Sequence, residues 1–141
     1  MATGTLTRRS TANLGTNIKN GLVGGLVAAV LALILFFVGS AIVGPLEVAQ
    51  QPGAPIAPLP WFMVVVMSFV PAVVAALLLT ALQRFTGSAT SIFVIAAVAV
   101  FIFMLFPALT QTATVGISVV LILLHVAVAI PIVWALLQRP V

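Results

Sequence analysis

Reactive side chains are almost absent from this 141-residue chain. It has no cysteine, no aspartate and no tyrosine, and its single side-chain carboxylate and single imidazole belong to Glu47 and His125. Disulfides, thiol nucleophiles, catalytic carboxylate pairs and multidentate metal sites are therefore excluded by residue count. We expect a protein that is not an enzyme and has no metal site, and we assign it no cofactor.

Charge is equally scarce. Only 4% of the residues are charged, whereas an ordinary soluble domain is about a quarter charged. Apolar residues make up 64% of the chain and the mean hydropathy is +1.43. Such a chain could not cover its surface with polar groups in water, so lipid must be the solvent for most of it.

Four apolar stretches are long enough to cross a membrane. A spanning helix needs roughly 20 mostly apolar residues, because the hydrocarbon core is about 30 Å thick. The predicted spans are residues 22–43, 61–82, 88–109 and 115–137. The sequence therefore predicts an all-α, polytopic protein with four transmembrane helices in an up-down bundle. Residues 21–141 form this domain, after a polar, basic tail of residues 1–20.

The basic residues predict the orientation of the chain. With four crossings, all five of them fall on one side of the membrane: Arg8, Arg9, Lys19, Arg84 and Arg139. The positive-inside rule then places both termini in the cytoplasm. These basic residues give the chain a pI of about 12.0, and the positive-inside rule already accounts for them. They are dispersed along the chain and do not form a patch that would bind nucleic acid. The alternative is that the first span is a cleaved signal peptide. The apolar core of a signal peptide has only about 7–15 residues, however, and is shorter than this span.

Small residues predict where the helices meet. In lipid the hydrophobic effect contributes little to helix association, so helices are held together by close packing, which small residues permit. The first span has one row at Gly21, Gly25 and Ala29 and another at Gly24, Ala28 and Ala32, and the second span has Ser68, Ala72, Ala76 and Thr80. These rows could face one another or another chain.

A polar stripe runs along the fourth span to His125, which lies near the bilayer midplane. Thr114, Ser118 and His125 fall within about 40° of one helix face, and Ser68 of the second span lies at a suitable depth to be their partner. An ionisable residue at this depth suggests a functional site, for a ligand, a pigment or a proton. A neutral imidazole that only hydrogen-bonds a neighbouring helix is the alternative.

Several segments resemble a family of small bacterial membrane proteins. They are Leu-Leu-Leu-Thr-Ala-Leu-Gln-Arg at 77–84, Phe-Pro-Ala at 106–108 and Leu-Leu-His-Val-Ala-Val-Ala at 123–129, together with a proline-containing first loop. The chain is similar to the uncharacterised four-helix integral membrane proteins of domain of unknown function 6069. This resemblance implies four helices in a bacterial cytoplasmic membrane, and it implies no activity.

Three functions remain open at this point. The first is an accessory or structural subunit of a membrane complex, whose partners are the lipid bilayer and other membrane subunits or further copies of the chain. The second is a small homo-oligomeric transporter or channel for a neutral or apolar solute. The third is axial binding of a haem- or chlorophyll-type cofactor through His125.

Overall fold

Four long helices make up most of the molecule. The computed structural model describes residues 14–138. The helices are α1 (Leu14–Val43), α2 (Trp61–Phe85), α3 (Ala89–Thr110) and α4 (Val115–Leu137), and two short strands, β1 (Glu47–Val48) and β2 (Ala57–Pro58), lie between α1 and α2. All four helices are long and apolar enough to cross a membrane. The predicted all-α fold with four spans is confirmed.

The helix bounds differ from the predicted spans mainly at the start of the chain. α4 has the predicted bounds, and α2 and α3 end at Phe85 and Thr110, slightly beyond them. α1 begins at Leu14, so residues 14–20 of the predicted tail are helical. The rest of that tail, with Arg8 and Arg9, lies outside the described residues, as does Arg139.

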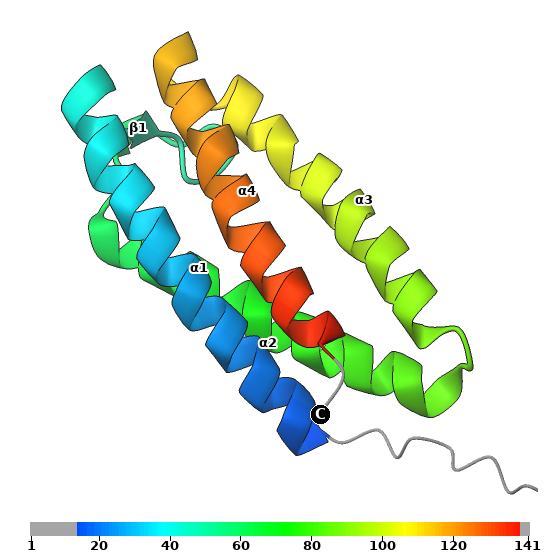
Figure 1. Cartoon of the computed structure of the whole chain (residues 1–141). Coiled ribbons are helices and arrows are strands. Elements are labelled where there is room, and N and C mark those ends of the chain that lie inside the picture. The colour runs from blue at the N-terminus through cyan, green and yellow to red at the C-terminus, as the bar shows by residue number, and fades with distance from the viewer. Residues whose placement is uncertain (1–13, 139–141) are drawn as a thin grey trace, which may run out of the picture.

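α1 is the helix around which the bundle is built. Figure 1 shows α1, α4 and α3 side by side in one layer, with α2 running obliquely behind them, and successive helices alternate in direction. α1 packs extensively against both α4 and α2, whereas α3 packs only sparsely against α4 and α2. We call the end of the bundle that carries Lys19 and Arg84 the basic end, and the end that carries β1 and β2 the hairpin end.

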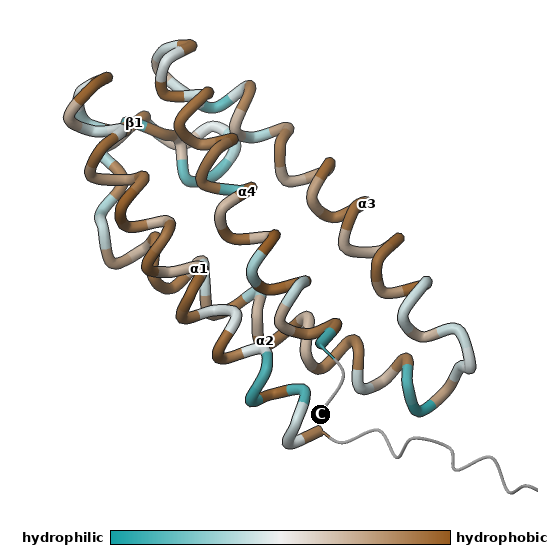
Figure 2. Tube along the Cα trace, in the orientation of Figure 1, coloured by the Kyte–Doolittle hydropathy of each residue, from teal (hydrophilic) through white to brown (hydrophobic). Residues whose placement is uncertain are grey.

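Figure 2 shows that the helices consist mostly of hydrophobic residues, with a few hydrophilic ones, for example near the start of α1. Side-chain size distinguishes the inner faces of the helices from the outer faces. Alanines such as Ala28, Ala32, Ala72 and Ala76 are fully buried, whereas most large aliphatic and aromatic side chains are exposed. In water this arrangement would be unstable. It is the pattern expected in lipid, where small residues let helices approach and large ones face the acyl chains.

The first connection forms a small hairpin. Glu47 pairs with Pro58 and Val48 with Ala57 in antiparallel register, and the Leu59 amide donates to the Leu46 carbonyl over 2.7 Å. The Leu46 side chain is only 2% exposed, so it anchors the hairpin on the bundle. Hydropathy and proline content did not predict this pairing.

The hairpin also reaches the second connection on the same end of the bundle. The Ala49 amide donates to the Gln111 carbonyl over 3.0 Å, and Val48 forms an isolated antiparallel bridge with Thr112. These backbone contacts join the α1–α2 connection to the α3–α4 connection. The hairpin end is therefore held by hydrogen bonds as well as by packing.

Candidate functional site

The polar residues at the start of α4 are occupied in capping the helix. The Thr114 hydroxyl caps α4 by accepting from the Ile117 amide over 3.4 Å. Ser118 lies one turn further on, where its hydroxyl is 2.6 Å from that of Thr112 and 3.4 Å from the Thr114 carbonyl oxygen. Thr114 and Ser118 therefore lie together, as their spacing predicts, and their partners are the adjoining loop and the helix backbone.

His125 is half-buried near the middle of α4. Its Nδ1 lies 2.7 Å from the Leu121 carbonyl oxygen, one turn earlier in the same helix. A carbonyl oxygen can only accept, so Nδ1 must carry the proton. In the neutral ring, Nε2 then holds the lone pair, and the tautomer is fixed by α4 itself rather than by another helix.

Ser68 is fully buried in α2, and its hydroxyl donates to the Val64 carbonyl over 2.8 Å. Among residues 14–138, no hydrogen bond links this side chain to His125, Ser118 or Thr114. The four predicted stripe residues thus divide into the pair Thr114 and Ser118 at the hairpin end, of which Thr114 caps α4, and two separate intrahelical bonds. Each bond stays within one helix: it satisfies the Ser68 hydroxyl proton and the His125 Nδ1 proton, and it leaves Nε2 of His125 without a partner among these residues.

The two small-residue rows of α1 serve different neighbours. A methyl group on Gly21 would lie 2.9 Å from the Ala72 backbone oxygen in α2. One on Gly24 would lie 2.9 Å from the Ala135 side chain and 3.0 Å from the Pro131 backbone oxygen in α4. All eight predicted packing residues are buried within this chain: Gly21, Gly24, Gly25, Ala28, Ala29, Ala32, Ala72 and Ala76.

A polar cluster between α1 and α2 at the basic end was missed in the sequence. The Asn17 amide nitrogen donates to the Thr80 hydroxyl and to the Gln83 side-chain oxygen, each over 2.8 Å, and Asn17 is only 6% exposed. The available signal was spacing, because Asn17 continues the row of Gly21 and Gly25 by one turn toward the N-terminus. These bonds explain why α1 begins before its apolar run.

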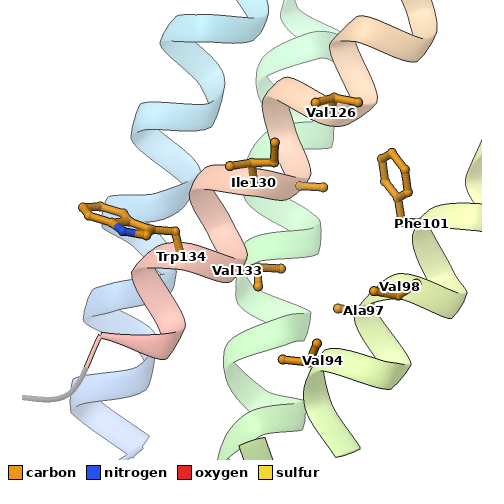
Figure 3. Close-up of a pocket in the computed structure, with 9 residues that line it drawn as sticks. Val94, Ala97, Val98, Phe101, Val126, Ile130, Val133 and Trp134 are labelled. Carbon is orange, nitrogen blue, oxygen red and sulfur yellow. The ribbon is translucent and has the colours of Figure 1, made fainter. Parts of the chain in front are cut away.

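An apolar cleft of about 470 Å³ separates α3 from α4. Figure 3 shows Val94 and Val133 pointing into the gap from opposite helices. The full lining consists of Val94, Ala97, Val98 and Phe101 of α3 with Val126, Ala129, Ile130, Val133 and Trp134 of α4. His125 is not among these residues. The volume lies within the range of about 300–1,000 Å³ that is typical of small-molecule sites.

The cleft exists because α3 is held mainly near its ends. Only Ala89, Phe93 and Ala108 of this helix are buried. Phe93 is 1% exposed and packs into the apolar cluster that contains Leu79 of α2 and Leu136 of α4. Between Phe93 and Ala108 no residue of α3 is buried, and the small side chains of Ala97 and Ala129 leave the space between α3 and α4 open.

A second hollow, of about 490 Å³, lies around the α2–α3 connection at the basic end. Polar and charged side chains contribute to it, among them Gln83, Arg84 and Thr90. Thr90 precedes Val94 of the cleft by one helical turn, so the two hollows follow the same face of α3.

The fold and these sites define a small, polytopic four-helix membrane protein with an apolar interior. Over residues 12–140 the chain matches a family of unknown function, DUF6069, and it belongs to that family. The family predicted from the segments around Arg84, Pro107 and His125 is therefore confirmed. Comparison with curated proteins and with solved structures gave no match.

Proposed function

We propose that this chain is a non-catalytic accessory or structural subunit of a membrane complex. The observation that carries the proposal is the sparse packing of α3, which buries only three of its 22 residues. Because packing contacts hold helices together in lipid, a helix with so few of them within its own chain is suited to pack against another chain. The α1 rows are already covered by α2 and α4 and do not offer such a surface.

The outward face of α3 is the part of this helix that we assign to the partner. Ile95, Ile102 and Phe103 lie there, and all three are well exposed and do not line the cleft. Exposed polar groups are few on this face, so the expected partner surface is itself an apolar transmembrane helix. The assembly would then form within the membrane and involve little of the connections.

We further propose a bacterial cytoplasmic membrane, with the basic end facing the cytoplasm. Lys19 and Arg84 lie at that end, and Glu47 lies at the other. This distribution agrees with the positive-inside rule and would place both termini inside. Alkaline phosphatase and fluorescent-protein fusions to the α2–α3 connection and to the hairpin test this arrangement.

The decisive test is the native mass of the tagged chain after extraction in mild detergent at native expression. A second membrane protein at fixed stoichiometry supports a subunit, and its identity gives the process. A chain that runs only as a monomer or as a homo-oligomer contradicts this function.

A crosslinking experiment then locates the contact. A photoactivatable amino acid replaces Phe103 of α3, which is 72% exposed, and the matched control replaces Ile34 of α1, which is 56% exposed. Crosslinks to the co-purified protein from Phe103 and none from Ile34 are expected. Equal crosslinking from both positions would show that α3 is not the docking helix.

Axial ligation through His125 is the second candidate. The bond from Nδ1 to the Leu121 carbonyl supports it, because this bond leaves the Nε2 lone pair in the neutral ring. Visible absorbance of the purified chain, lost in His125→Ala and retained in Ser68→Ala, would support this candidate. A colourless preparation from cells supplied with haem precursor would count against it.

A further inference from the structure

We propose that the α3–α4 cleft and the hollow at the basic end together bind one anionic phospholipid. One acyl chain lies in the cleft, and the phosphate of the headgroup lies beside Arg84.

The cleft has the shape and chemistry of an acyl-chain site. Its nine lining side chains are apolar except for the indole nitrogen of Trp134. From Val94 to Phe101 it extends about 10 Å along α3. An apolar cleft of this length, with no other polar side chain among the described residues that line it, suits a stretch of hydrocarbon chain.

The cleft is also accessible from the bilayer. Val98, Ile130 and Trp134 line it and are each more than half exposed. A lipid chain can therefore enter sideways between α3 and α4 without crossing the bundle.

The basic hollow continues the cleft toward the membrane surface. Thr90 lines the hollow and Val94 lines the cleft, and these residues are one turn, or about 6 Å, apart on α3. A headgroup in the hollow and a chain in the cleft can thus belong to one lipid molecule.

Charge complementarity identifies the headgroup as anionic. Arg84 lines the hollow and is exposed, and a guanidinium binds phosphate oxygens through paired hydrogen bonds. Glu47, the only acidic side chain, lies in β1 at the opposite end, so no side-chain carboxylate of this chain competes for Arg84. A free phosphate would occupy only the hollow, and a second copy would bring further positive charge.

The test measures lipids retained on the full chain by native mass spectrometry. The protein is released from nanodiscs of phosphatidylglycerol and phosphatidylcholine in equal amounts, with identical acyl chains. The wild type should retain one lipid, with phosphatidylglycerol preferred about fivefold, the factor that one basic residue supplies near a membrane surface. Retention without headgroup preference, or no retained lipid, would overturn the proposal.

Two alanines of α3 form a matched pair for the chain site. Ala97→Leu places a larger side chain in the cleft and should reduce retention of both lipids at least fivefold. Ala99→Leu makes the same change at an exposed position outside the cleft and should retain lipid as the wild type does. Equal retention by the two variants would refute the acyl-chain site, and circular dichroism confirms that both are folded.

Two exposed basic residues form the pair for the headgroup. Arg84→Gln should abolish the preference for phosphatidylglycerol while total retention persists, and Lys19→Gln should leave the preference unchanged. An equal loss in both variants would show only a general effect of charge and would refute the role of Arg84. Inorganic phosphate at millimolar concentration should not displace the lipid, and displacement would identify the hollow as a site for phosphate alone.

Discussion

The contact between α1 and α4 can be tested at Gly24, where the two backbones approach each other. A methyl group at this position would lie 2.9 Å from the Ala135 Cβ and 3.0 Å from both the Ile132 Cα and the Pro131 backbone oxygen. Two of these three neighbours are backbone atoms, so α4 itself must move to accommodate Gly24→Ala. Overpacking of this kind costs about 1–3 kcal/mol.

A helix-propensity gain opposes this cost. Replacing a glycine by alanine within a helix contributes up to about 1 kcal/mol. Gly24→Ala should therefore lower the free energy of unfolding by about 0–2 kcal/mol, and Gly24→Val, with two more methyl groups, by about 3 kcal/mol. Unfolding by increasing mole fraction of sodium dodecyl sulfate in mixed micelles, followed by circular dichroism, measures both values.

Gly116 supplies the control for this prediction. The nearest neighbour of a methyl group there would be the Val43 side chain, at 3.2 Å, which can shift, and the Thr114 hydroxyl would lie at an ordinary contact distance of 3.9 Å. Gly116→Ala should be neutral or should stabilise by up to about 1 kcal/mol. Equal stability of Gly24→Val and the wild type would refute the reasoning, because it would show that α4 does not press on α1.

Three further predictions concern the polar and loop contacts and use the same unfolding assay. Asn17→Ala should lower the free energy of unfolding by about 1–2 kcal/mol, because two interhelical hydrogen bonds are lost. A double-mutant cycle with Gln83→Ala should give a coupling energy of about 0.5–1 kcal/mol, and additive effects would contradict the hydrogen bond between these two residues. His125→Leu should change stability by less than about 1 kcal/mol, because its bond is intrahelical, and a loss above about 2 kcal/mol would indicate a missed interhelical partner. Leu46→Ala should cost about 2–5 kcal/mol because this buried leucine anchors the hairpin, and an unchanged midpoint would contradict that role.

Hydropathy predicted the spans well because lipid imposes a length on each of them. The bounds of α4 agree with the prediction since Thr114 and Gln138 interrupt the apolar run at both ends. The start of α1 was not predicted, because Asn17 and Lys19 are typical of a solvated tail. Only the three-dimensional contact of Asn17 with α2 shows that this turn of helix is paired.

The site was predictable only in part, for a related reason. Small residues predict helix contacts in lipid, so the rows containing Gly24 and Ala72 identified the faces that α1 and α2 bury. α3 is apolar on every side and has no such row, so its sequence does not indicate how it is oriented. Phe93, beside the cleft, is one bulky residue among many in α3, and its insertion into the core is visible only in the structure.

The two-sided packing of α1 has a consequence for biosynthesis. Ribosomes make α1 before α4, yet Gly24 of α1 is covered by Pro131, Ile132 and Ala135 of α4. An α1–α2 pair that has already entered the membrane can cover the face of Gly21, while the face of Gly24 stays in contact with lipid until α4 is made and inserted. A chain that stops before α4 therefore leaves Gly24, and the row of small residues that it begins, without the α4 contacts of the folded protein.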